Sequence, residues 1–123
     1  MQLLKVGIDV VDLERFRAVL QRRPGIGKKI FSPNELSDMA QRVDPVPGLA
    51  ARFCAKEAFL KAVGRGLFAC DLKEIELYNS ASGAPQLRLY NRALALADGI
   101  GAQSLNLSVS HSNLVATAIV IIS

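Results

Sequence analysis

The chain has 123 residues, and its 15 Lys and Arg against 11 Asp and Glu give a net charge of +4. Half of the residues are apolar, which is the composition of a single globular domain and excludes a disordered or collagen-like chain. The basic balance favours acidic partners. The sequence has no Trp and no basic run interleaved with aromatic residues, which disfavours a nucleic-acid-binding surface.

Membrane spans, export and structural cysteine sites are also disfavoured. The longest apolar run, Val115–Ile122, is far shorter than the roughly 20 residues that a helix needs to cross a bilayer. The first residues show no export signal, and Cys54 and Cys70 stand outside the spacings of zinc sites and disulfide frameworks. We therefore expect a cytoplasmic protein that forms one domain over residues 1–123 and has no membrane span.

The first predicted element is a strand over Leu3–Val10. Side chains alternate along a strand, so Gly7 and Asp9 share one face. The other face is apolar, and we expect it to be buried: Leu4, Val6, Ile8 and Val10.

Two helices are predicted next. Asp12 caps a helix that runs to about Gln21, and the segment Pro24–Gly27 (PGIG) ends it. The segment Ser32–Glu35 (SPNE) starts a short helix, because it offers a capping Ser, a Pro in the first turn and a Glu three residues after the cap.

A longer helix is predicted over about Gly48–Val63, with Gly64 as its left-handed C-terminal residue. Four strands and one more helix complete the chain: strands Glu74–Tyr78 and Gln86–Tyr90 as a hairpin, a helix Asn91–Asp98 capped by Asn91, and strands Ser104–Ser110 and Val115–Ile122. This order predicts an α+β fold, a single domain in which one mostly antiparallel sheet packs against the long helix.

Two carboxylates are out of place in these elements. Glu57 falls on the apolar stripe of the long helix, where an unpaired buried charge costs several kcal/mol. An ion pair of Glu57 with Lys61 or Arg52 is the structural interpretation, and a bound metal ion is the functional one. Asp9, on an apolar strand, is either an edge-strand polar residue or partner of a lysine, or it meets Glu57 across the strand–helix interface. Two such carboxylates are the usual protein share of a magnesium site.

Two further features suit a phosphate ligand. His111, the one histidine, stands at a strand end among small hydroxyl residues. It is either a hydrogen-bonded structural residue or a contact to a phosphate or nucleotide. Lys61 precedes Gly64 and Gly66, which are either a helix C-terminus beside solvated basic residues or a place where the backbone approaches a ligand closely.

Two segments, Val6–Arg15 (VGIDVVDLER) and Arg52–Ala62 (RFCAKEAFLKA), resemble motifs of the small holo-[acyl-carrier-protein] synthases of the 4′-phosphopantetheinyl transferase superfamily. The first is similar to the family's opening Gly-x-Asp motif with its following Arg. The second is similar to its Phe-x-x-Lys-Glu-Ala-x-x-Lys signature. Phe31–Glu35 and Ser108–His111 fall in the family's order, so the likeness spans the chain from Val6 to the C-terminus.

The resemblance implies transfer of 4′-phosphopantetheine from coenzyme A to a serine of apo acyl carrier protein, with release of 3′,5′-ADP. It implies that Asp9 and Glu57 bind Mg²⁺ at the pyrophosphate and that Lys61 contacts the phosphates. The serine proton needs an acceptor, for which Glu57 and a metal-bound water are the candidates. The nucleotide end of coenzyme A is expected at a second group of residues: Arg52, Lys61, Gly64, Gly66 and His111.

The resemblance also implies docking of the acidic carrier protein on Arg15, Arg22 and Arg23, and a homotrimer whose sites lie between subunits. Two positions depart from the family pattern: Asn106, where many relatives carry a second His, and Arg65, where relatives often have a small residue or Thr. The alternative function is a non-catalytic subunit on the same fold that binds coenzyme A or a nucleotide. Such a subunit would need neither carboxylate.

Overall fold

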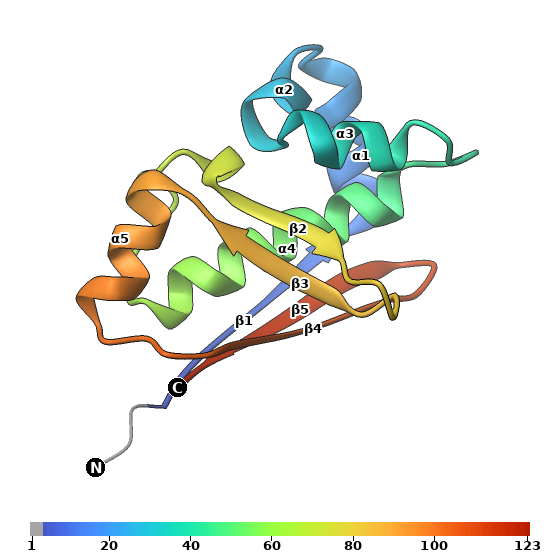
Figure 1. Ribbon diagram of the computed structural model, residues 1–123. Helices are drawn as coiled ribbons and strands as arrows, with labels where there is room; N and C mark the ends of the chain where they lie inside the picture. Colours follow the sequence, from blue (N-terminus) through green and yellow to red (C-terminus); the bar gives the residue numbers. More distant parts are fainter. Residues whose placement is uncertain (1–3) are drawn as a thin grey trace.

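A long helix crosses one face of a three-stranded sheet in the computed structural model, which describes residues 4–123 (Figure 1). The elements follow one another in this order: β1 (Lys5–Asp12), α1 (Leu13–Arg22), α2 (Ile26–Ile30), α3 (Pro33–Met39), α4 (Val46–Ala62), a short 3₁₀ helix η1 (Leu72–Glu74), β2 (Ile75–Asn79), β3 (Pro85–Leu89), α5 (Asn91–Gly99), β4 (Leu105–His111) and β5 (Val115–Ile122). The α+β fold is confirmed. The predicted first residue of the first strand, Leu3, lies outside the described residues.

The strands within residues 4–123 form two sheets, whereas the sequence predicted one. β1, β5 and β4 form an antiparallel sheet in that order, and β2 and β3 form a separate antiparallel hairpin. The α4 helix contacts strands of both sheets, so it is the element around which the domain is built (Figure 1). No helix in this part of the chain is long and apolar enough to span a bilayer.

The helix starts follow the local sequence signals, with two exceptions. Asp12 caps α1 by accepting a hydrogen bond from the Arg15 backbone N–H at 2.9 Å, and Ser32 and Glu35 form the predicted capping box of α3. The α2 helix was missed, because it begins inside a segment whose Pro and Gly residues predict a break. The predicted cap of α5 is wrong: Asn91 is its first residue, at φ +48°, and the Ala93 N–H of the first turn donates to Glu74 Oε1 at 3.2 Å.

The α4 helix packs so closely on β1 that only glycine fits at one position of the strand. A Cβ atom on Gly7 would lie 1.8 Å from the Ala58 carbonyl oxygen and 2.7 Å from the Ala62 nitrogen. Small residues of β5, Ala116 and Ala118, are buried in the same sheet. The helix begins at Val46, slightly before the predicted start, and ends as predicted before the left-handed Gly64.

The buried face predicted for β1 is exposed. Its large apolar side chains are 52% to 68% exposed: Leu4, Val6, Ile8 and Val10. The glycine face, not the apolar face, meets α4, because only the glycine lets the helix come close. The chain alone therefore leaves an apolar sheet face uncovered, which continues onto Ile119 and Ile121 of β5.

Candidate active site

Asp9 and Lys61 meet where β1 packs on α4. Asp9 shares the Gly7 face of the strand, because residues two apart point the same way. The Lys61 Nζ donates hydrogen bonds to Asp9 Oδ1 at 3.0 Å and to the Ile8 carbonyl oxygen at 3.1 Å. A strand and a helix, both rigid elements, thus position the two groups.

Glu57 lies within the electrostatic reach of this pair. Burial raises the pKa of Glu57 above its ordinary value, the negative charge of Asp9 raises it further, and Lys61 opposes the rise. The buried Cys54, one helical turn earlier, responds to the same charge: burial, followed by Asp9, raises its pKa to about 12. The structure therefore pairs Asp9 with Lys61, and it places Glu57 near enough for both charges to act on its pKa.

The residues of this cluster fit a hard divalent cation. The ammonium group of Lys61 is paired with Asp9 at 3.0 Å, and Glu57, one helical turn before Lys61, adds a second carboxylate that has no ion pair among the described residues. Within residues 4–123, no three His, Cys, Asp or Glu residues gather as a metal cluster. Two carboxylates with the remaining oxygens supplied by water or phosphate are a usual arrangement for Mg²⁺ and an unusual one for zinc.

Arg52 lies apart from the cluster, on another side of α4. Its nearest carboxylate is Asp38, at 4.0 Å, so the ion pair with Glu57 that the sequence allowed is not formed. The side chain is only 6% exposed. Its Nη1 donates to the Gly48 carbonyl oxygen at 3.3 Å, while Nε and Nη2 have no hydrogen-bond partner among the described residues.

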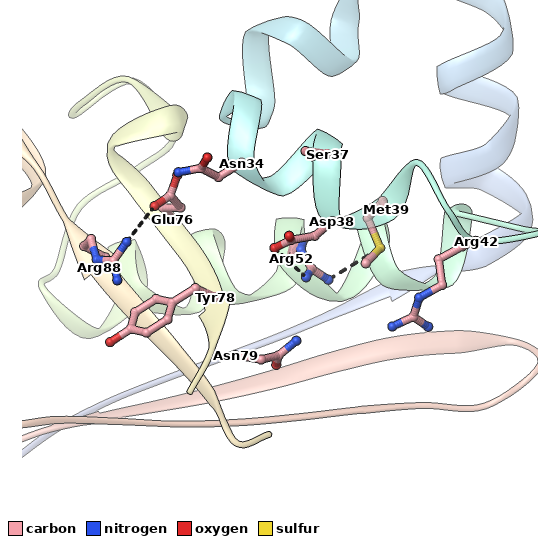
Figure 2. Close-up of a pocket in the computed structure, with 10 residues that line it drawn as sticks. All are labelled: Asn34, Ser37, Asp38, Met39, Arg42, Arg52, Glu76, Tyr78, Asn79 and Arg88. Atoms are coloured by element: carbon pink, nitrogen blue, oxygen red, sulfur yellow. Dashed lines mark hydrogen bonds and ion pairs between the residues drawn. The ribbon is translucent and has the colours of Figure 1, made fainter. Parts of the chain in front are cut away.

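Arg52 is one of the residues that line a cavity of about 480 Å³ between α3 and the β2–β3 hairpin (Figure 2). Burial lowers the pKa of the guanidinium, although the charges of Glu35 and Asp38 oppose this change. Buried polar groups without partners are costly and rare in proteins. An anion at this place would give the Arg52 nitrogens an acceptor, and a phosphate group matches the guanidinium geometry.

The other predicted ligand residues are exposed. Gly64 and Gly66 lie in the loop after α4, where an added Cβ would meet nothing within 4 Å. His111 ends β4, two strands away from β1, and borders a smaller cavity of about 360 Å³ next to the ion pair of Arg17 and Asp44. Among the described residues, neither the two glycines nor His111 contacts the side chain of Asp9, Glu57 or Lys61.

The predicted docking arginines form an exposed basic surface on the first helix. Arg15 lies in the first turn of α1, Arg22 is its last residue, and Arg23 follows. Two exposed lysines of α2, Lys28 and Lys29, continue the series. They were not predicted, because the helix that carries them was not recognised.

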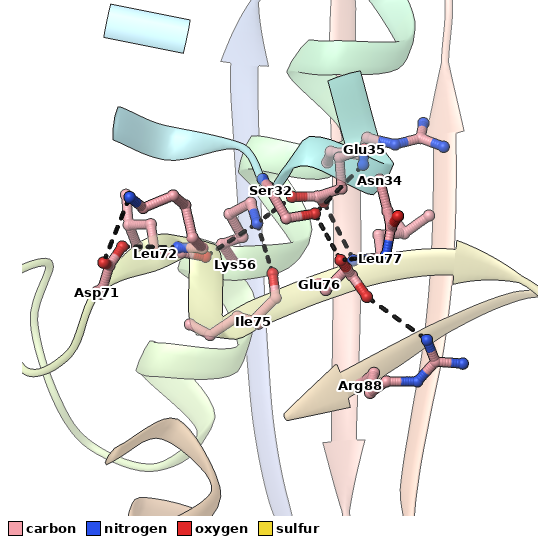
Figure 3. Close-up of polar contacts among 12 residues, drawn as sticks. Ser32, Asn34, Glu35, Lys56, Asp71, Leu72, Ile75, Glu76, Leu77 and Arg88 are labelled. Atoms are coloured by element: carbon pink, nitrogen blue, oxygen red, sulfur yellow. Dashed lines mark hydrogen bonds and ion pairs between the residues drawn. The ribbon is translucent and has the colours of Figure 1, made fainter. Parts of the chain in front are cut away.

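A buried ion pair next to the cluster was also missed. Lys56 is fully buried, and its Nζ donates to Glu35 Oε1 at 2.7 Å, to the Leu72 carbonyl oxygen at 2.9 Å and to the Ile75 carbonyl oxygen (Figure 3). Three acceptors satisfy the three ammonium protons. This contact ties α4, at the residue before Glu57, to α3 and β2. The signal was present in the sequence, because Lys56 stands on the apolar helix just as Glu57 does.

Comparison with known proteins gives consistent matches over nearly the whole chain. The model of the 4′-phosphopantetheinyl transferase superfamily matches residues 5–118. A holo-[acyl-carrier-protein] synthase of Syntrophus aciditrophicus is 42% identical over 94% of this chain and 92% of its own length. The crystal structure of the corresponding enzyme of Neisseria meningitidis superposes with a TM-score of 0.86 at 33% identity, covering 97% of each chain. A coenzyme A complex of the Chronobacterium ammoniagenes protein superposes with a TM-score of 0.87 at 30% identity, covering 99% of this chain and 98% of that one.

Proposed function

Because this chain belongs to the holo-[acyl-carrier-protein] synthases of the 4′-phosphopantetheinyl transferase superfamily, we propose that it transfers phosphopantetheine in a Mg²⁺-dependent reaction that releases 3′,5′-ADP. The serine oxygen of the apo carrier protein forms a bond to the phosphorus next to pantetheine. The bond from this phosphorus to the bridging pyrophosphate oxygen breaks, and 3′,5′-ADP leaves with the electron pair. The serine proton must pass to a base.

The observation that carries this proposal is the contact of Asp9 with Lys61 at the β1–α4 interface, on the same helix as Glu57 and one turn after it. Asp9 and Glu57 would hold Mg²⁺, which would supply charge neutralisation at the pyrophosphate. Lys61, held by Asp9, would place its ammonium group beside the same phosphates and stabilise negative charge that develops on the leaving group. Glu57 or a water molecule bound to the metal would accept the serine proton.

We assign the nucleotide end of coenzyme A to Arg52, together with His111 and the backbone of Gly64 and Gly66. Arg52 precedes Lys61 by nine residues, or about two and a half helical turns, so the two side chains leave α4 on opposite sides. A coenzyme A molecule whose pyrophosphate lies at Lys61 of one copy would therefore contact Arg52 of a neighbouring copy more readily than Arg52 of the same copy. This consideration favours the homotrimer with sites between subunits.

The apolar face of β1 supports the same assembly. Three large apolar side chains of β1, and Leu4 just before it, are more than half exposed, and a second copy of the chain would cover them. The basic surface of Arg15, Arg22 and Arg23, extended by the lysines of α2, would remain available for an acidic carrier protein. A cytoplasmic location stays a prediction from the sequence.

The reaction is tested by incubating the protein with coenzyme A, Mg²⁺ and apo acyl carrier protein, followed by mass spectrometry of the carrier. We expect a mass increase equal to one phosphopantetheine group, and its loss when a chelator removes the metal. Binding of coenzyme A without any mass increase would support the non-catalytic subunit instead. Turnover that survives full removal of divalent ions would contradict the metal assignment.

A further inference from the structure

The Lys56 side chain holds α4 from the side opposite to β1. Side chains two residues apart on a helix point about 200° apart, so Lys56 leaves α4 nearly opposite to Ala58, where Gly7 of β1 packs on the helix. The buried ammonium group of Lys56 binds oxygen atoms of three other elements: Glu35 of α3, Leu72 of η1 and Ile75 of β2 (Figure 3). The α4 helix is therefore held between β1 and this three-point contact.

The carboxylate that accepts from Lys56 is itself held in place by backbone groups. Glu35 Oε1 also accepts a hydrogen bond from the Ser32 backbone N–H at 3.0 Å, and Glu35 Oε2 accepts one from the Leu77 backbone N–H at 3.1 Å. The side chains of Lys56 and Glu35 are both fully buried. Since three acceptors surround the ammonium group and both carboxylate oxygens are bonded, neither side chain can shift without breaking a buried hydrogen bond.

Stability alone does not explain a buried ion pair at this place. The cost of removing two charges from water cancels much of their attraction, and apolar residues of similar volume often stabilise a core equally well. An ammonium group differs from an apolar one because its three protons must each point at an acceptor. Three acceptors on three other elements fix both the rotation of α4 about its axis and its position along that axis.

Glu57 is the next residue of the same helix after Lys56. It lies about 1.5 Å further along the axis and about 100° further around it. A rotation or slide of α4 would therefore move Glu57 relative to Asp9, which belongs to β1 and does not move with the helix. Replacement of groups that orient metal ligands commonly lowers metal affinity or activity by roughly 10–100-fold.

We propose that Lys56, anchored by Glu35, is a positioning residue that sets the orientation of α4 and thereby holds Glu57 where it can bind the same divalent cation as Asp9. Lys56 is fully buried, so it acts through the helix and touches neither the metal nor the substrates. This inference rests on the metal assignment of the proposed function and adds a residue that the assignment does not contain.

The test compares metal binding by the wild type, by Lys56→Met and by the double variant of Lys56→Met with Glu35→Gln. Mn²⁺, which prefers the same oxygen ligands as Mg²⁺, is titrated alone and followed by electron paramagnetic resonance at a temperature where all the proteins are folded. In Lys56→Met we expect the affinity for Mn²⁺ to fall about tenfold or more, and the Mg²⁺ concentration for half-maximal transfer to rise by a similar factor. The double variant regains stability but not the three-point contact, so its metal affinity should stay low.

Ile122→Ala is the matched control for loss of stability. Ile122 is fully buried on β5, four residues after the sheet partner of Asp9, and takes no part in the contacts of Lys56. We expect a lower unfolding temperature with wild-type affinity for Mn²⁺. An equal loss of affinity in this control would overturn the proposal, because the effect would then follow stability alone.

Wild-type affinity for Mn²⁺ in folded Lys56→Met would also overturn the proposal. Recovery of affinity together with stability in the double variant would do the same, and the double variant decides alone if Lys56→Met does not fold. Low affinity in the double variant beside wild-type affinity in Ile122→Ala is the result that supports a positioning role.

The outcome separates this inference from the proposed function. Wild-type protein that binds Mn²⁺ in a manner dependent on Lys56 but makes no modified carrier protein would refute the transfer and support the positioning role. Protein that modifies the carrier with Mg²⁺ while Lys56→Met keeps the wild-type metal affinity would refute the positioning role alone. Wild-type protein that binds no divalent cation would refute the metal assignment and this inference with it.

Discussion

Gly7→Ala tests whether the close packing of β1 on α4 assembles the carboxylate cluster. The new methyl group would lie 1.8 Å from the Ala58 carbonyl oxygen and 2.7 Å from the Ala62 nitrogen. Both are backbone atoms of a long helix, so no side chain can rotate away. Since Cβ atoms scarcely ever approach other heavy atoms to less than 3.0 Å, the strand must retreat from the helix by about 1 Å or more.

This displacement acts on stability and on the site at once. Overpacking of a core costs roughly 1–3 kcal/mol, and a clash with backbone belongs at the upper end, which lowers the unfolding temperature by about 10 °C in a domain of this size. Asp9 is two residues away on the same strand, so the 3.0 Å contact with Lys61 would lengthen or break. A misplacement of about 1 Å at a catalytic group costs on the order of 100-fold in turnover.

Two measurements check the prediction: thermal unfolding by circular dichroism, and turnover at a temperature where both proteins are folded. Gly99→Ala is the control, because an added Cβ there meets nothing within 4 Å, and we expect wild-type turnover and an unfolding temperature within a few degrees. If Gly7→Ala unfolds at the wild-type temperature and turns over at the wild-type rate, close packing at Gly7 does not position the cluster.

Four further predictions follow from individual contacts. Glu57→Gln should abolish transfer. It should also raise the unfolding temperature of the metal-free protein at pH values above the ordinary carboxylate pKa, because burial raises the pKa of Glu57 and its ionised form therefore opposes folding. If Mg²⁺ raised the unfolding temperature of both proteins equally, Glu57 would not be a metal ligand. Lys56→Met should lower the free energy of unfolding, measured in urea, by about 3–5 kcal/mol, since it leaves Glu35 buried without a cation. The double variant with Glu35→Gln should recover part of this loss. If the losses of the two single variants simply add, Lys56 and Glu35 do not stabilise each other. Arg15→Glu should raise the Michaelis constant for carrier protein far more than that for coenzyme A, and equal increases would exclude a docking role. Ile8→Glu should yield folded monomers in light scattering, and an unchanged assembly would show that this face is not an interface.

The candidate site illustrates what motif and periodicity revealed. Asp9 and Glu57 were recognisable because a charged residue on an apolar strand or helix face requires a partner or a ligand, and Lys61 because it precedes two glycines at the helix end. Lys56 obeyed the same criterion but turned inward to Glu35, which only the packing of α3 on α4 could reveal.

The sequence by itself determined the longer helices, the strands and their order, since caps, turns and hydrophobic periodicity act within a few residues of the chain, but it missed the short α2 and η1 helices. Tertiary structure alone decided that the strands divide into two sheets and that the glycine face of β1, not its apolar face, meets α4. The physical reason is that the distance between a strand and a helix depends on the side chains of both elements, which lie far apart in the sequence. A face without side-chain bulk lets a helix approach to contact distance, and this gain outweighs the burial of larger apolar groups that another surface can cover.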